Sequence, residues 1–590
     1  MASHSVNKTQ LEPTLMAQAH SDMPIHQRGP SHKATLRSAI AHARRKISTK
    51  HGWVGDYDYG YLCMPALPFM RQKQRSPPFY GLHDDLPLVV GMVTGLQHAL
   101  TMLTGLITPP IIFANSLSLD EQTSTYMISA SLISCGILSL VQMSRIHLFG
   151  RFYLGTGLLT IVGTSFATLS TATAVFNAMY ADGTCPSTTN TDGSTTRGPC
   201  PDAYGKLLGT SLICSFFEII ISFFPARILR RIFPPLVTGT VILLVGASLV
   251  GESGIPNWGG GSNDCHNRPT TGIFQLCPTI FAPRPLPWAS PEFIGLGFLS
   301  FVTIIFVEVF GSPFMKNISI IIGLAVGGIV AGATGYIEGS TIQSAPAITF
   351  LWVYRFKIGV YPPAILPMLA VYISLIMEAI GDTTASAEAS RLAVEGPDFD
   401  SRIQGGVLSD GIGGFFSALF TVTPLSTFIE NNGIIVITRC ANRGAGRWCC
   451  VFLVLFGVFG KISGVFLAIP KSVLGGVTTF LFANIAASGL RVLAYTKFTR
   501  RERFILAAAL SFGFGDLLAP GIFTHLFDGV DNPSRGLQGL FNSITIVLET
   551  PFLSAGIVAS LLNVIVPREV ADDDELTLDD KEAQTYAENQ

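Results

Sequence analysis

Apolar stretches long enough to cross a membrane dominate this chain. A helix of about 20 apolar residues spans a bilayer, and the sequence contains roughly fourteen such stretches. Only 13% of its residues are charged, against roughly 25% in a soluble domain. We therefore predict an all-α polytopic membrane protein with about 14 transmembrane spans. The stretches centre near residues 97, 135, 165, 214, 242, 301, 327, 372, 415, 433, 460, 481, 511 and 555.

Basic residues gather in alternate connections between these stretches, as expected for cytosolic loops. The polar residues 1–50 lack the apolar segment of a secretory signal. We therefore expect a cytosolic N-terminus and, after an even number of spans, a cytosolic acidic C-terminus. The basic loops hold Arg145 and Arg151; Arg227, Arg230 and Arg231; Lys316; Arg391 and Arg402; Arg439, Arg443 and Arg447; and Lys497, Arg500, Arg501 and Arg503.

Two pairs of cysteines lie in loops on the opposite side. Cys185 and Cys200 flank a polar loop, and Cys265 and Cys277 bracket another. Either pair could form a disulfide if these loops face the oxidising exterior, and free thiols are the alternative for both. The ten cysteines show no metal-binding spacing, so we expect no metal.

Two of the predicted spans contain residues that interrupt a helix. The third span, 155–176, is rich in glycine, serine and threonine, and the tenth begins "TVTPLSTFIENNG". Non-helical backbone at membrane depth is tolerated only inside the protein or beside a cavity. The two segments are seven spans apart in our count. Matched broken segments in two halves are typical of an inverted-repeat transporter with its substrate site between them.

The eighth span carries two carboxylates. Glu378 and Asp382 have i, i+4 spacing and therefore share one helical face. If both were ionised they would repel each other, so at least one should bind a proton, a cation or a ligand. The alternative is that the helix ends near Gly381, which would leave Asp382 at the membrane interface.

The tenth segment supplies Glu430, Asn431, Asn432 and Thr438. If a half-helix starts near Asn431, its free backbone N–H groups point at the membrane midplane and favour an acceptor-rich ligand. A helix cap and interhelical hydrogen bonds are the alternative for the two asparagines. In the partner break, Phe166 could stack on a flat ring or could simply be packing.

The first span places Gln97 and His98 side by side in mid-span. Interhelical hydrogen bonding and a role near the substrate site are equally good interpretations of Gln97 and His98.

No P-loop sequence occurs, so ATP does not drive transport. The intramembrane carboxylates favour a proton as the coupling ion and no other cofactor. The residues thus predict a secondary transporter for a small planar heterocycle.

At these residues the sequence resembles the nucleobase–ascorbate transporter family, or nucleobase:cation symporter 2. "ENNGIIVITR" looks like the family signature, with Asn and Gly at fixed spacing before Thr and a basic residue. "QH" in the first span and "EAIGDTTA" in the eighth are two further family motifs. The resemblance covers about residues 52–568 and is nearest to the uric acid–xanthine permeases of filamentous fungi.

The resemblance implies two inverted seven-span repeats with core and gate domains. Transport would follow an elevator-type movement of the core, coupled to protons, in a homodimer of the plasma membrane. The implied boundaries are 1–80 for the cytosolic tail and pre-membrane segment, 81–233 for core spans one to four, 234–363 for gate spans five to seven, 364–470 for core spans eight to eleven, 471–567 for gate spans twelve to fourteen, and 568–590 for the acidic tail.

Family membership also implies roles for individual residues. Glu378 would bind the purine ring N–H groups, and Phe166 and Ala385 would contribute backbone contacts. Asn431 would hold the hydrogen-bond network of the site. Asp382 and His98 would serve structure or proton coupling. The implied gating or selectivity residues are Arg491, Thr550 and Phe552.

Glu430 departs from the pattern of the xanthine and urate transporters, which usually have glutamine at this position. An ionised glutamate offers only acceptors and would repel the urate anion. Glu430 is therefore protonated, or the substrate presents a ring N–H at this point.

Xanthine and uric acid are the expected substrates, and uracil or a broader range of nucleobases is the alternative. An anion exchanger, a membrane-bound enzyme and a non-transporting receptor are more distant alternatives. With a net charge of -1, the chain gives no sign of binding nucleic acid.

Overall fold

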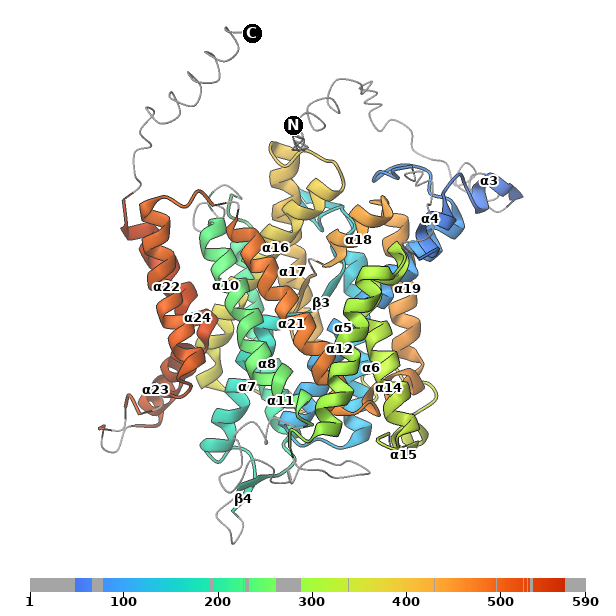
Figure 1. Cartoon of the computed structure of the whole chain (residues 1–590). Coiled ribbons are helices and arrows are strands. Elements are labelled where there is room, and N and C mark those ends of the chain that lie inside the picture. The colour runs from blue at the N-terminus through green and yellow to red at the C-terminus, as the bar shows by residue number, and fades with distance from the viewer. Residues whose placement is uncertain are drawn as a thin grey trace, which may run out of the picture.

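The computed structural model describes residues 48–65, 78–189, 195–225, 228, 233–260, 288–337, 339–428, 430–494, 496–523, 525–527, 529–530 and 534–567. Within these ranges the chain is mostly helical (Figure 1). Seven of the described helices are long and apolar enough to cross a membrane, and nine spans result if each of two bent helix pairs counts as one. The polytopic helical fold is therefore confirmed, and the count of 14 spans stays a prediction.

The predicted apolar centres fall within helices of the structure, except residue 165, which directly precedes one. The helices are α3 (Lys50–Trp53), α4 (Tyr59–Cys63), α5 (Leu88–Ser116), α6 (Glu121–Gln142), α7 (Phe166–Ala181), α8 (Pro201–Ile221), α10 (Pro235–Leu249), η2 (Val250–Gly254), α11 (Ile255–Trp258), α12 (Pro291–Phe310), α13 (Pro313–Asn317), α14 (Ser319–Ala333), α15 (Gly339–Ser344), η4 (Pro362–Ala364), α16 (Ile365–Ala389), α17 (Pro397–Leu419), α18 (Glu430–Thr438), α19 (Arg443–Val458), α20 (Gly460–Leu467), α21 (Lys471–Leu493), α22 (Arg500–Leu518), α23 (Arg535–Leu548) and α24 (Pro551–Ile565).

Local chemistry explains where several of these helices begin. The Asp120 carboxylate caps α6 by accepting a hydrogen bond from the Thr123 N–H at 3.1 Å, which satisfies one of the free donors of the first turn. Ser290 caps α12 in the same way. Proline opens α8, α10, α12 and α24, where its missing N–H is not needed.

The long helices pack into two groups that alternate along the sequence. The first helix group consists of α5, α6, α7, α8, α16, α17, α18 and α19, and the second of α10, α12, α14, α21, α22 and α24. In the second group α10 and α21 cross closely, because a Cβ on Gly246 would lie 2.4 Å from the Ala486 nitrogen. The groups meet where α10 contacts α7 and α16, where α14 contacts α5, and where α24 contacts α16. The assignment of these groups to core and gate domains stays a prediction.

Two short strands from distant parts of the chain pair inside the first helix group. β3 (Val162–Thr164) and β6 (Leu425–Thr427) are antiparallel, with Val162 opposite Thr427. Each strand leads into a helix, α7 after β3 and α18 after β6. This pairing satisfies backbone groups that lipid could not satisfy, and it brings the N-terminal ends of α7 and α18 together.

The other four strands form two hairpins. β1 (Ile146–Phe149) pairs with β2 (Phe152–Leu154), and β4 (Ser187–Thr189) pairs with β5 (Thr195–Arg197). The β4–β5 hairpin lies at the lower end of the molecule in Figure 1, and α3 and α4 lie at the upper end.

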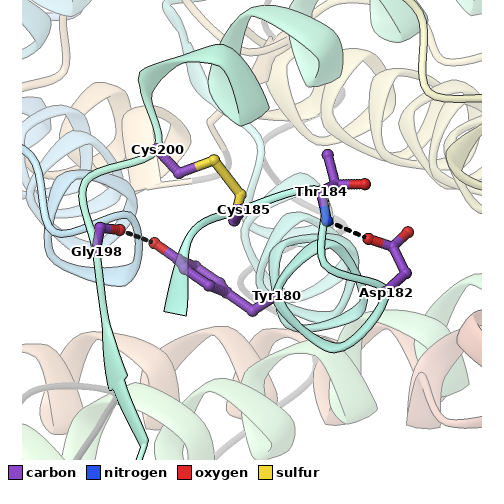
Figure 2. The surroundings of a disulfide bond; sticks show 6 residues. All are labelled: Tyr180, Asp182, Thr184, Cys185, Gly198 and Cys200. Atoms are coloured by element: carbon purple, nitrogen blue, oxygen red, sulfur yellow. Dashed lines mark hydrogen bonds between the residues drawn. A yellow bond between two sulfur atoms is a disulfide. The ribbon is translucent and has the colours of Figure 1, made fainter. Parts of the chain in front are cut away.

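A disulfide joins Cys185 to Cys200 at the base of the β4–β5 hairpin (Figure 2). Beside it, the Tyr180 hydroxyl donates a hydrogen bond to the Gly198 carbonyl at 2.7 Å. The sequence left open whether Cys185 and Cys200 form a disulfide or remain free thiols; in the structure they form the disulfide. The other pair, Cys265 and Cys277, lies outside the described residues.

Candidate functional site

Two neighbouring cavities lie between the helix groups and share Glu378 and Asp382 of α16. The larger has a volume of about 800 Å³. The narrow cavity, of about 50 Å³, reaches the start of α7 and α18. The second helix group contributes Ile242 of α10 and Ser488 of α21 to both. The two eighth-span carboxylates therefore stand where the larger cavity meets the narrow one.

The α16 carboxylates have different surroundings. Asp382 is buried and accepts a hydrogen bond from the Thr427 hydroxyl of β6 at 3.0 Å. Glu378, one turn earlier, is partly exposed and lines both cavities. Because α16 continues to Ala389, the alternative in which the helix ends near Gly381 is wrong. Asp382 holds α16 to the strand pair, and Glu378 remains available to a ligand.

Glu430 is the first residue of α18 and lines the narrow cavity. Since the helix begins here, its free N–H groups face the same region. The next two residues make contacts that hold the site together. Asn431 donates from Nδ2 to the Leu159 carbonyl at 2.6 Å, and the Asn432 oxygen accepts from the Ser386 hydroxyl at 2.5 Å.

Two phenylalanine rings stack at the narrow cavity. Phe166, the first residue of α7, and Phe428, which follows β6, have ring centroids 5.5 Å apart and an angle of 14° between the rings. Phe482 of the second helix group meets Phe166 edge-on at 5.9 Å. Phe166 was predicted from the sequence as a site residue, and Phe428 was not. Phe428 could have been predicted, because it lies beside the polar break of the tenth span as Phe166 lies beside the break of the third.

Gln97, His98 and Thr438 lie outside both cavities, as does Asn431, but close to the polar segments. Gln97 and His98 are fully buried on α5. His98 lies next to Asn431, so it contacts the network behind the cavity rather than the cavity itself. Both Gln97 side-chain atoms lack a hydrogen-bond partner among the described residues. Thr438, at the last turn of α18, donates to its own helix at Ile434.

The other family-implied residues fall into two sets. Ala385 and Arg491 line the larger cavity only. Thr550 and Phe552 are buried at the bend between α23 and α24 and line neither cavity. The Thr550 hydroxyl donates to the Ile546 carbonyl at 2.6 Å. The structure therefore brings Ala385 and Arg491, but not the other two, to the cavity walls.

A further pair of carboxylates was not predicted from the sequence. Glu218 of α8 and Asp410 of α17 are buried, and none of their oxygens has a hydrogen-bond partner among the described residues. Glu218 packs beside Gly411, the residue after Asp410, since a Cβ added at Gly411 would lie 3.1 Å from Glu218 Cγ. Asp410 is near enough to act on Glu218 with the same sign of charge. Both residues could have been predicted as functional candidates, because each is a carboxylate within an otherwise apolar part of its span. Across the described ranges, no cluster of three or more metal-ligating side chains occurs.

A helical bundle with broken spans and carboxylates at the junction of two cavities defines a polytopic membrane transporter. Residues 91–522 match the model of a permease family. The chain belongs to this family, the nucleobase–ascorbate transporters, which are permeases rather than enzymes.

Named relatives match almost the whole chain. A purine permease of Emericella nidulans is 49% identical over 94% of this chain and 94% of its own length. The uric acid-xanthine permease of the same organism is 48% identical over 91% of this chain and 92% of its own. Among solved structures, the transmembrane domain of the cyanobacterial bicarbonate transporter BicA matches 72% of this chain and 95% of its own. Its TM-score is 0.47 and its identity 14%.

Proposed function

We propose that this chain is a secondary active transporter that imports purines and that xanthine and uric acid are its preferred substrates. The proposal rests on one observation: two carboxylates and two stacked aromatic rings line the same cavity. Glu378 and Glu430 line the narrow cavity together with Phe166 and Phe428. Carboxylates accept hydrogen bonds from ring N–H groups, and aromatic rings favour flat ligands. The names of the two fungal relatives support purines as the substrate class.

In this proposal Glu378 binds the purine ring N–H groups and Phe166 contacts the ring. Ala385 offers its backbone from the wall of the larger cavity. Asp382 keeps α16 attached to the strand pair through Thr427, and Asn431 ties α18 to the segment before β3. His98 acts on this network through Asn431.

Protons drive the transport in our proposal, because the cavities contain carboxylates among apolar helices. The first helix group is the core domain and moves against the second, the gate domain, in an elevator-type cycle. The larger cavity includes Glu395 and Arg491, which border loops that the positive-inside rule assigns to the cytosol. This supports a cavity that opens to the cytosol, with both termini there. The protein acts as a homodimer in the plasma membrane.

Glu430 favours a second candidate within the class, a uracil or broader nucleobase transporter. It lines the narrow cavity at the start of α18, where an ionised carboxylate repels an anion such as urate. The same acidic lining disfavours an anion exchanger, whose site should be more cationic.

The test is uptake of radiolabelled xanthine by cells that lack their own purine transporters. Unlabelled urate, uracil, hypoxanthine, guanine and ascorbate serve as competitors. Accumulation that xanthine and urate block best supports the proposal, and preferential block by uracil supports the second candidate. An uncoupler should stop accumulation, and uptake that survives it excludes a proton as the driving ion. Binding without accumulation would indicate a receptor.

A further inference from the structure

A carboxylate in the turn that continues α10 of the second helix group binds two serine hydroxyls near the narrow cavity. Glu252 lies in η2, a π-helical turn that follows α10. One of its oxygens accepts from the Ser248 hydroxyl at 3.1 Å, and the other accepts from the Ser170 hydroxyl of α7 at 3.2 Å. The two serine oxygens are 3.0 Å apart. We call these three residues the Glu252 contact; it joins the first helix group to the second.

The course of α10 shows on which side of the site this contact lies. Thr238 lines only the larger cavity, Ile242 lines both cavities, and Val245 lines only the narrow one. Ser248 and Glu252 follow about one and two turns further along the same direction. The Glu252 contact is therefore on the far side of the narrow cavity from the larger one.

The course of α7 leads to the same position. Phe166 lines the narrow cavity at the first residue of α7, and Ser170 follows about one turn later. The helix then runs to Ala181, just before the Cys185–Cys200 disulfide. The contact therefore lies between the narrow cavity and the hairpin end of the molecule.

The surroundings of Glu252 make the serine hydroxyls its principal partners. No ion pair to Glu252 occurs within the described ranges, and Asp516 of α22 is near enough to act on it with the same sign of charge. Ser170 and Ser248 are both buried. Glu252 itself is half-buried, and hydrogen bonds to a charged acceptor are about twice as strong as those between neutral groups. A π-helical turn often marks a functional position in a helix.

We infer that the Glu252 contact closes the substrate cavity at its far end and must break in every transport cycle. The inference rests on the proposed function, because a transporter exposes its site alternately to the two sides. To open the far side, α7 must move away from α10 at Ser170. Glu252 is thus a positioning residue of transport that binds the opposite helix group and not the substrate.

The test replaces both serines with cysteine in the full chain, as Ser170→Cys/Ser248→Cys. The hydroxyl oxygens of the two serines are 3.0 Å apart, so the side chains that replace them point at one another, as a disulfide requires. We expect a mild oxidant to cross-link the pair and lower xanthine uptake at least tenfold, and a reductant to restore it. The two single variants and the wild type, carried through both treatments, control for native thiols and for the Cys185–Cys200 disulfide.

Cross-linking is measured by peptide mapping and does not depend on the substrate. A pair that fails to cross-link, or that cross-links without loss of uptake, overturns the inference. Absence of xanthine uptake in the untreated wild type contradicts the proposed function instead. The two failures are therefore distinguishable.

A second set of variants tests Glu252 itself with Ser170 and Ser248 in place, because the double-cysteine variant replaces the hydroxyls that donate to this carboxylate. Glu252→Ala removes the acceptor and should lower xanthine uptake about tenfold. Glu252→Gln keeps an acceptor oxygen and should lower uptake less than threefold. Wild-type uptake by Glu252→Ala would show that this side chain does not hold the two helix groups together.

Discussion

The rings of Phe166 and Phe428 stack with their centroids 5.5 Å apart, although 262 positions separate the two residues. Each residue closely follows one strand of the β3–β6 pair, so the strand register fixes both rings at one end of the narrow cavity. The pairing therefore determines the shape of the candidate site, as well as satisfying the backbone of two broken segments.

Glu378→Gln should reduce xanthine uptake about 10- to 100-fold while the protein remains at the cell surface. Hydrogen bonds that involve a charged group contribute about 1.5–3 kcal/mol, which corresponds to this range. The matched control is Glu388→Gln, on the same helix and lining only the larger cavity. Uptake and surface labelling are measured together. Normal uptake by Glu378→Gln would exclude this carboxylate from the site.

Glu430→Gln should improve urate as a competitor about tenfold relative to uracil. The substitution removes a negative charge that repels the urate anion, and a tenfold change corresponds to about 1.4 kcal/mol. The measurement is competition of urate, xanthine and uracil against labelled xanthine. Glu388→Gln again controls for a general change of charge in the cavities. Unchanged competition by all three compounds would show that Glu430 does not choose the substrate.

Thr427→Val should weaken uptake because Asp382 loses the hydroxyl that donates to it at 3.0 Å. A buried acceptor without its partner costs about 1–3 kcal/mol. Thr427→Ser keeps the hydroxyl and should restore most of the uptake. Comparison of KM and of the maximal rate in the two variants checks the prediction. Equal KM and maximal rate in Thr427→Val and Thr427→Ser would exclude a role for this hydrogen bond.

Gly163→Ala should disturb the stacked rings. A Cβ at this position would lie 2.5 Å from the Phe428 ring and 2.8 Å from Leu106 Cδ2, and overpacking of this kind costs about 1–3 kcal/mol. We expect a lower unfolding temperature of the purified protein and weaker xanthine uptake. Gly413→Ala on α17 is the control, since no atom lies within 4 Å of its added Cβ. A fully active Gly163→Ala variant would contradict this packing.

Cys185→Ser/Cys200→Ser should lower the unfolding temperature in non-reducing conditions. The two cysteines are 15 positions apart, and a disulfide that closes such a loop contributes about 3 kcal/mol. Cys63→Ser removes an exposed free cysteine and serves as the control. Identical unfolding temperatures for the double variant and the wild type would show that this disulfide does not stabilise the fold.

Features that depend on neighbours within about two helical turns were predictable from the sequence. Apolar runs identify buried or lipid-facing helices because each residue must suit its own surroundings. The shared face of Glu378 and Asp382 follows from i, i+4 spacing alone. The start of α18 was predicted near Asn431 and occurs at Glu430, because the polar and glycine residues that interrupt the span are themselves local.

Features that depend on contacts between distant segments were decided by the tertiary structure. Gln97 and His98 resemble cavity residues in sequence, but α5 places both outside the two cavities. The stack of Phe428 on Phe166, the packing of Glu218 beside Gly411, and the Glu252 contact join residues from different spans. The sequence by itself determined that the chain crosses a membrane and carries intramembrane carboxylates. Only the packing of the two helix groups decided which carboxylates face a cavity, because side-chain direction and strand register are fixed by partners far away in the chain.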